Sequence, residues 1–303
     1  MYDPLDMSRY FVLPGWRLAL LTGRLPPGCP PLDSICSILK RRGINVPHWH
    51  IFGGQGRVGE GGVEQKLNVN VGIRGKDGGE GGGGGPGRDV SEGAHIFLVL
   101  HITDCSVPLE EVVEELERSG TMYSVRAYLS PVEGFIADVA SHPLLAGNNR
   151  VVILRDSGYR ELLAGLREWF GTNGTSFLYH VGFRAGSGFG SLHMETAEKV
   201  GLKDPVQIYR NISAAMFQWA GFGVMEVEEL TADGGVIVVR DSFECELGKN
   251  SATVYSQFVR GMIAGVLAEL FGYGFNVVEE ECIARGAPTC RFRVRALHKK
   301  PAD

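Results

Sequence analysis

Apolar and polar residues alternate in the first half of the chain in a pattern that predicts four strands and two helices. Strands are expected over residues 16–24, 44–52, 95–103 and 121–129. Apolar positions recur at helical spacing over 31–42 and 108–119, and Gly43 and Gly120 stand where each helix should end. The predicted order, βαββαβ, is that of a ferredoxin-like sandwich.

The second half shows longer helical periods and then antiparallel strands. Helices are expected over 158–170, 176–200, 207–220 and 256–271, and strands over 150–154, 223–230, 235–240 and a final hairpin. Gly182, Gly186 and Gly190 recur at four-residue spacing in the second of these helices. Each glycine costs a helix about 1 kcal/mol relative to alanine. Three on one face therefore predict the close approach of another backbone.

A glycine-rich insert separates the second and third predicted strands. Ten of the 19 residues from Gly75 to Gly93 are glycine. This composition cannot bury enough apolar surface to offset the entropy of ordering, so residues 75–93 are expected to be disordered. We expect one domain over residues 12–133, a connector over 134–149 and a second domain over 150–298.

Composition and charge narrow the class of protein. The 303 residues are 44% hydrophobic and 21% charged, with a net charge of −5, which argues against a general affinity for nucleic acid or anionic membranes. No apolar run approaches the length of a membrane span, and the N-terminus lacks the order of a signal peptide. A cytoplasmic location is expected, and six cysteines do not make a disulfide scaffold.

Candidate chemistry concentrates near the end of the chain. Cys282 and Cys290 flank a turn centred at Gly286, with Glu279 three residues before the first thiol. Cross-strand neighbours have Cβ atoms about 5 Å apart, so the two thiols could share a metal ion, form a disulfide or remain half-buried thiols. Strand alternation would put Glu279 and Cys282 on opposite faces, so a shared site needs a bulge or a strand end.

Together with the helix before it (258–267), this hairpin resembles the end of a 4-vinyl-reductase (4VR) domain. That domain belongs to a ligand-binding superfamily shared with aromatic-responsive bacterial sensors and TRAPP-complex subunits. The resemblance covers about residues 150–297 and implies an α+β ligand-binding fold. It also implies a structural zinc held by Glu279, Cys282, Cys290 and a third cysteine. Ser256 stands at that third position, so Cys245 is expected to complete the site if its segment folds back.

The first half carries a second resemblance. Its Pro-Gly turn at residues 26–28, the helix after it and the Gly-Ile-Asn-Val sequence at 43–46 are similar to the opening of an ACT domain. ACT domains have a ferredoxin-like fold and commonly bind small effectors where two copies pair. The expected architecture is α+β: an ACT-like βαββαβ sandwich followed by a 4VR-type domain. A homodimer is expected because both fold types often pair with themselves.

Large apolar side chains in the second half predict a ligand pocket where the 4VR family encloses its ligand. The candidates are Phe217, Trp219, Phe222, Phe243, Tyr255, Phe258, Met262 and Phe275. An ordinary packed core produces the same pattern. The cavity is expected between 207–220, 223–240 and 256–271, with Gly261 and Gly265 thinning one wall. Aromatic sensors fix a phenolic hydroxyl with a His and a Trp, and residues 217 and 239 replace them here with Phe and Val, which favours a more apolar ligand or none.

Other motifs carry less chemistry. The sequence Gly54–Gly59 fits GxGxxG but opens no helix, so a dinucleotide site is rejected. Four histidines fall on two strands that should be neighbours and could bind a metal, although such residues are more often exposed sheet positions. They are His48, His50, His95 and His101. His180 and His193 are interpreted as packing or surface residues.

The expected function is a small-molecule-binding regulatory or sensor protein. The sequence has no helix-turn-helix, ATPase or kinase motif, so its output would pass through a partner. One alternative is a reductase acting on a vinyl group of a tetrapyrrole, which would need an electron source that no nucleotide fingerprint or iron–sulfur spacing supplies. The other is a non-catalytic assembly scaffold of the TRAPP-subunit type. No Ser-His-Asp or Cys-His arrangement indicates catalytic residues.

Overall fold

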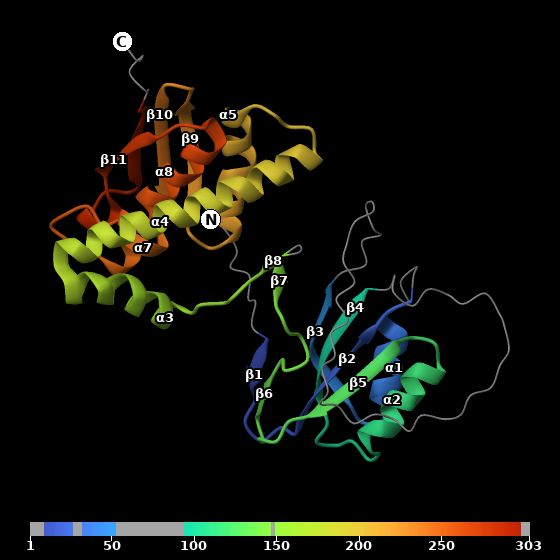
Figure 1. Cartoon of the computed structure of the whole chain (residues 1–303). Helices are drawn as coiled ribbons and strands as arrows, with labels where there is room; N and C mark the ends of the chain where they lie inside the picture. The colour runs from blue at the N-terminus through green and yellow to red at the C-terminus, as the bar shows by residue number, and fades with distance from the viewer. Residues whose placement is uncertain (1–8, 27–31, 53–93, 147–148, 298–303) are drawn as a thin grey trace, which may run out of the picture. The chain divides into compact units, whose positions relative to one another are not determined.

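The computed structural model describes residues 9–26, 32–52, 94–146 and 149–297 (Figure 1). The chain divides into two compact units, Met1–Val151 and Val152–Asp303, and each is described by itself. The glycine-rich insert over 75–93 and the Gly54–Gly59 motif lie outside the described residues.

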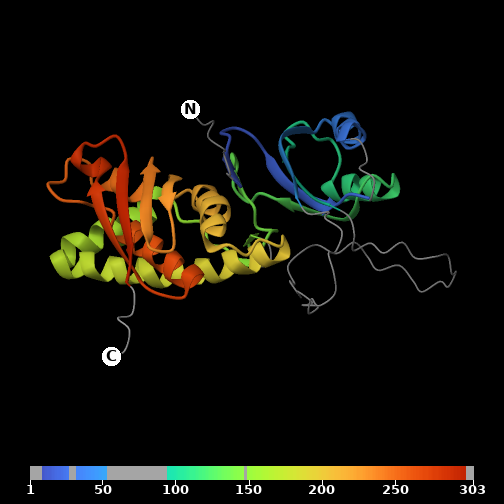
Figure 2. The same cartoon turned by 90° about the horizontal axis from the view of Figure 1, so that it is seen from above.

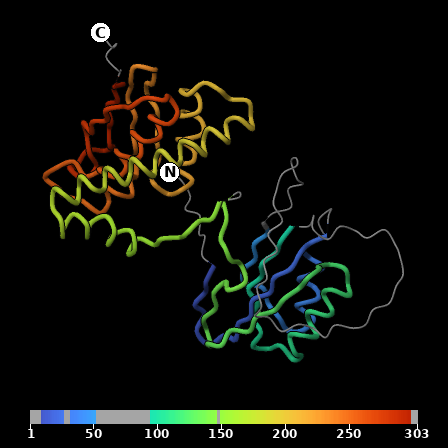
Figure 3. The backbone as a smooth tube through the Cα atoms, in the orientation of Figure 1, coloured from blue at the N-terminus to red at the C-terminus, as the bar shows by residue number. Residues whose placement is uncertain are grey.

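The N-terminal unit is built on a four-stranded antiparallel sheet with two helices on one face (Figure 3). Its elements are β2 (Leu18–Arg24), α1 (Leu32–Arg41), β3 (Asn45–Phe52), β4 (His95–His101), α2 (Leu109–Arg118) and β5 (Tyr123–Leu129). The strand order is β3-β4-β2-β5, with every neighbouring pair antiparallel. This is the predicted ferredoxin-like arrangement. The helices pack because their apolar faces, which include Ile35 and Leu116, are buried against the sheet.

Two short strands cover the other face of this sheet. β1 (Tyr10–Val12) pairs with β6 (Phe135–Ala137), and Ile136 is buried with Phe97 and Val99 of the central strand β4. The expected connector over 134–149 therefore contributes to the first unit's core. It also holds β7 (Leu145–Ala146) and the start of β8 (Asn149–Arg150).

The strand predicted over 150–154 is wrong. Only residue 150 pairs, in β8, and the residues after it form no strand. Val152 and Ile153 are exposed, because no other strand lies alongside to complete a ladder. A short apolar run without a hydrogen-bonding partner remains extended chain.

The C-terminal unit combines an antiparallel sheet, in the order β11-β12-β10-β9, with a buried helix. The helical elements of the unit are α3 (Asp156–Arg160), η2 (Glu161–Gly165), α4 (Leu166–Lys199), α5 (Pro205–Ile208), η3 (Tyr209–Ser213), α6 (Ala214–Trp219), α7 (Phe243–Leu247), α8 (Gln257–Phe271) and η4 (Ile283–Arg285). The strands are β9 (Val224–Leu230), β10 (Gly234–Arg240), β11 (Phe275–Glu281) and β12 (Cys290–Ala296). Helix α8 lies between the sheet and α4 (Figure 2). It is apolar on all sides, as a helix in that position must be.

Helices α4 and α8 touch through their backbones along a glycine seam formed by Gly182, Gly186, Gly261 and Gly265. A Cβ on Gly186 would lie 2.2 Å from a carbonyl oxygen of α8, and one on Gly265 would lie 2.1 Å from a carbonyl oxygen of α4. The predicted close approach at the α4 glycines is confirmed. Contrary to the expectation from the sequence, Gly261 and Gly265 do not thin the wall of a cavity, because the backbone of α4 fills the space beside them.

Helix α4 has a second face directed away from α8. A break in helical geometry at Gly171 (φ 53°, ψ −127°) separates its first turn from the straight remainder. Phe177, Val181 and Leu192 on the straight part are exposed. Despite the length of α4, none of the helices in the described ranges is long and apolar enough to cross a bilayer.

Candidate metal centre and aromatic cluster

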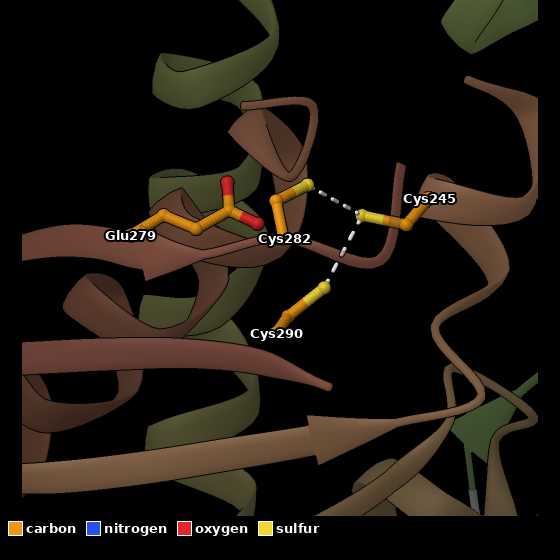
Figure 4. A group of neighbouring side chains, drawn as sticks. All are labelled: Cys245, Glu279, Cys282 and Cys290. Atoms are coloured by element: carbon orange, nitrogen blue, oxygen red, sulfur yellow. Dashed lines mark hydrogen bonds between the residues drawn. The ribbon is translucent and has the colours of Figure 1, made fainter. Parts of the chain in front are cut away.

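The structure brings the four predicted metal ligands together at one end of the C-terminal sheet (Figure 4). Cys245 comes from α7, Glu279 from β11, Cys282 from the residue after β11, and Cys290 begins β12. All four are buried, and their potential ligand atoms lie within 4.8 Å of one another. The Cys245 Sγ is 3.3 Å from the Cys290 Sγ and 3.6 Å from the Cys282 Sγ. We refer to these four residues as the cysteine cluster.

A bulge makes this arrangement possible. The register between β11 and β12 shifts between Glu279 and Glu281, which places Glu279 and Cys282 on the same side despite their odd spacing. The chain then turns through η4, and Gly286 adopts φ 94°, a conformation that glycine tolerates best. The requirement for a bulge or strand end, predicted from strand alternation, is confirmed.

Ser256 lies beside the cluster, where the family resemblance places a cysteine. Its hydroxyl donates to Glu279 Oε1 at 2.8 Å and lies 2.9 Å from the Cys245 Sγ. Its backbone N–H donates to Glu279 Oε2 at 3.2 Å. The serine therefore holds the carboxylate in place, and α7 folds back to supply the third thiol.

The electrostatics of the cluster favour a bound cation. Burial raises the pKa of Glu279 to about 8. The hydrogen bond with Cys282, together with burial, raises the pKa of Cys245 to about 12. The neighbouring thiols lower the pKa of Cys282, so the group by itself stabilises one thiolate rather than several anions.

The donor set fits zinc. Three thiolates and one carboxylate match a closed four-coordinate zinc site, in which thiolates ~2.3 Å from the metal would lie ~3.8 Å apart. The sulfur separations of 3.3 and 3.6 Å are near that value. A divalent cation would allow the buried acid and thiols to ionise together. Cys245, Glu279, Cys282 and Cys290 are the residues that would hold it.

The histidines of the N-terminal sheet form no such group. His101 stacks on Trp16 at a ring distance of 3.9 Å, and His48 packs against Phe11 at 4.8 Å. Within the part of the chain that the structure describes, the cysteine cluster is the one group of three or more His, Cys, Asp or Glu side chains arranged to hold a metal.

A second buried acid lies next to the cluster and was not found from the sequence. Glu244 is fully buried in α7 and accepts hydrogen bonds from the backbone N–H groups of Phe258 at 3.0 Å and Val259 at 2.8 Å. It also pairs with Arg167 of α4, whose guanidinium lies 4.0 Å from the centre of the Tyr255 ring. Burial raises the pKa of Glu244, and Arg167 opposes this shift. Glu244 thus caps α8 from 14 residues away, a distance at which no capping motif is readable.

Four of the predicted pocket residues form a chain of rings. Phe217 lies 5.4 Å from Phe222, Phe222 lies 5.2 Å from Phe243, and Phe243 lies 6.3 Å from Phe258. These spacings are those of favourable aromatic pairs. We call these four residues the aromatic cluster.

Two further rings join this cluster and were not predicted. Tyr159 of α3 lies 5.5 Å from Phe243, and Phe189 of α4 lies 6.3 Å from Phe222. Both come from helices whose order along the chain gave no indication of this contact. Ring contacts between distant helices are set by tertiary packing, which a single-sequence pattern does not specify.

The remaining pocket candidates lie elsewhere. Tyr255 stacks on Arg167, and Met262 is buried in the core of the unit. Phe275 belongs to a separate ring group with Phe271 and Tyr273, and the Trp219 side chain is 61% exposed.

The best-formed hollows in the described ranges lie apart from the aromatic cluster. One is over the β9–β10 turn, lined by residues such as Asp233 and Arg295, and the other is beside α1 and α2, lined by residues such as Ser37 and Arg41. Both are open at the surface and polar at their rims. The aromatic rings themselves occupy the space at their cluster.

His193 is a packing residue, as interpreted from the sequence. It is buried on the face of α4 that carries the glycine seam and lies 2.9 Å from the Ser213 hydroxyl through Nδ1. Burial lowers the pKa of His193 to about 4, so the ring is neutral near pH 7.

Comparison with known proteins gives the family of this unit. Residues 236–296 match the vinyl-4-reductase (4VR) domain family. The chain is 28% identical over 86 residues to the uncharacterized protein MJ0150 of Methanocaldococcus jannaschii, an alignment covering 28% of this chain and 50% of that protein. The chain thus spans half the length of this relative.

Three solved structures are similar at low identity. The phenol-responsive sensory domain of the transcription activator PoxR, with phenol, is 17% identical, with a TM-score of 0.46 over 52% of this chain and 82% of that one. A vinyl-4-reductase family protein from Methanocaldococcus jannaschii is 21% identical, with a TM-score of 0.34 over 50% and 86%. A trafficking protein particle complex subunit 3 from Naegleria fowleri, covalently bound to palmitic acid, is 18% identical, with a TM-score of 0.36 over 48% and 95%. The family match over β10 to β12 lies on the cysteine hairpin, and the C-terminal unit of this chain carries a 4VR domain.

Proposed function

We propose that the C-terminal unit binds an apolar small molecule at its aromatic cluster and acts as a sensor or regulatory module. The observation that carries this proposal is the convergence of rings from separate elements on one half-buried spot. Phenyl walls favour apolar or aromatic ligands. Rings that are only half-buried can also move aside more easily than a fully enclosed core.

The cysteine cluster is proposed to hold one structural zinc. Support comes from its four buried donors and from their mutual distances. Four protein ligands close a tetrahedral site and leave no position for a reacting molecule. Such a site would connect α7, β11 and β12 and stabilise the hairpin beneath the aromatic cluster.

The chain is further proposed to pair with a second copy through the exposed face of α4. Phe177 is 56% exposed there, and Val181 and Leu192 extend the same face. Exposed large apolar side chains gathered on one helix face are typical of an interaction surface. This proposal is independent of the ligand site.

The sensor proposal is tested with N-phenyl-1-naphthylamine, an uncharged apolar probe that fluoresces on leaving water. The purified chain should bind it saturably, and Phe222→Ala should weaken the affinity about tenfold, since removing one buried ring is worth ~1.5 kcal/mol or more. Phe271→Ala is the matched control, because that ring belongs to the separate group with Phe275. Absence of saturable binding would contradict the proposal.

Native mass spectrometry of the purified chain separates the proposal from its alternatives. A co-purified lipid-like or aromatic molecule supports a sensor. A bound tetrapyrrole would instead support the reductase, and an empty chain that also fails to take up the probe would support the scaffold.

A further inference from the structure

Helix α7 places three consecutive residues in three different sites. Phe243 belongs to the aromatic cluster, Glu244 caps α8, and Cys245 belongs to the cysteine cluster. The helix is five residues long. Helices this short have no stability of their own in water, so these tertiary contacts determine where α7 lies.

The first contact sets one wall of the proposed ligand site. The Phe243 ring lies 5.2 Å from Phe222, 5.5 Å from Tyr159 and 6.3 Å from Phe258. It is therefore the ring that joins the others, and a shift of α7 would separate three pairs at once.

The second contact fixes α7 to the central helix. Glu244 accepts from the first turn of α8 and pairs with Arg167 of α4. A buried carboxylate at a helix N-terminus is held by the backbone donors and the helix dipole. Glu244 thus anchors the middle of α7 independently of either cluster.

The third contact depends on what the cysteine cluster holds. Without a cation, the Cys245 thiol has two thiols and the Ser256 hydroxyl as its polar neighbours, and thiols are weak hydrogen-bonding partners. With zinc, the same sulfur would be a metal ligand, which is a far stronger constraint. The end of α7 would then be fixed two residues from the Phe243 ring.

We infer that zinc at the cysteine cluster and an apolar ligand at the aromatic cluster bind cooperatively, with α7 carrying the coupling. The inference rests on the proposed function of both sites. Ordering α7 through Cys245 lowers the entropy that a ligand must remove in ordering Phe243, and the reverse holds equally. The coupling is therefore positive and reciprocal.

The test measures the affinity for N-phenyl-1-naphthylamine with zinc loaded and with zinc removed by a chelator, while far-UV circular dichroism reports folding. The zinc-loaded chain should bind the probe at least about fivefold more tightly. The affinity for zinc, measured with and without saturating probe, should change by the same factor.

A measurement on the zinc-loaded chain covers the case in which the metal-free chain unfolds. Saturating probe should slow the loss of zinc to the chelator in the wild type and should have no effect in Phe243→Ala. Phe271→Ala, outside the aromatic cluster, should keep the wild-type response.

The outcomes separate this inference from the proposed function. Saturable probe binding whose affinity is the same with and without zinc, or a zinc release rate that ignores the probe, overturns the coupling and leaves the sensor proposal intact. A zinc-loaded chain that binds no probe defeats the sensor proposal itself. A chain that binds no zinc removes the basis of the inference and leaves the probe result to decide the sensor proposal.

Discussion

The glycine seam predicts opposite effects for two alanine substitutions that lie two residues apart on α4. A Cβ on Gly186 would lie 2.2 Å from the Met262 carbonyl oxygen and 2.8 Å from the Met262 Cα. A Cβ on Gly188 would meet no atom within 4 Å. Both residues lie in the regular part of α4, so the intrinsic gain in helix propensity is the same for both.

The magnitudes follow from that difference. Replacing glycine with alanine in a helix gains up to about 1 kcal/mol, and Gly188→Ala should show that gain in full. Overpacking a core costs about 1–3 kcal/mol, and Gly186→Ala belongs at the upper end because the obstructing atoms are backbone. Its expected net effect is a loss of about 2 kcal/mol.

Thermal unfolding followed by circular dichroism at 222 nm measures both effects. For a unit of this size, 1 kcal/mol corresponds to roughly 2–4 °C in Tm. Gly186→Ala should lower the Tm of the C-terminal unit by about 4–8 °C, and Gly188→Ala should raise it by about 2–4 °C. Equal stabilisation by both substitutions would mean that α4 and α8 are not in backbone contact, which would refute the description of the seam.

Three other predictions concern the pH response, the metal and the oligomer. Because burial lowers the pKa of His193 from its ordinary value of 6.5 to about 4, the unfolded chain takes up a proton that the folded chain refuses. The free energy of unfolding should therefore fall as the pH drops from 6.5 towards 4, and His193→Gln should flatten that fall in urea titrations. Metal analysis should find at most one zinc per chain, lost in a Cys282→Ser, Cys290→Ser double variant; retained zinc would place the site elsewhere. Sedimentation velocity should show a dimer that Phe177→Asp converts to a monomer, and an unchanged dimer would exclude this face of α4.

The fold of the first unit was readable from the sequence because glycine and proline punctuate its elements. Gly43 and Gly120, which follow α1 and α2, both adopt positive φ, so the stop signals had the physical cause assigned to them. β1 and β6 were missed because each has three residues, too few for alternation to be recognised.

The glycines of the second unit show where a correct pattern supports a wrong neighbour. Four-residue spacing on α4 indicated that something packs closely there, and α8 does. The glycines of α8 were interpreted separately as the wall of a cavity, although they pack against α4. Spacing on one helix reports that a face is crowded, and the identity of the neighbour depends on tertiary packing that the pattern does not contain.

The cysteine cluster shows the same limit from the side of chemistry. Glu279, Cys282 and Cys290 are close in sequence, so their hairpin could be inferred from spacing, whereas Cys245 is separated from Cys290 by 45 positions. Its arrival depends on the adjacent Glu244, which the first turn of α8 and Arg167 hold in place. Ser256, at the family's cysteine position, keeps its place beside the carboxylate but supplies a hydroxyl. The thiol missing from the start of α8 is thus replaced from α7, and this replacement is what brings the cysteine cluster within two residues of Phe243.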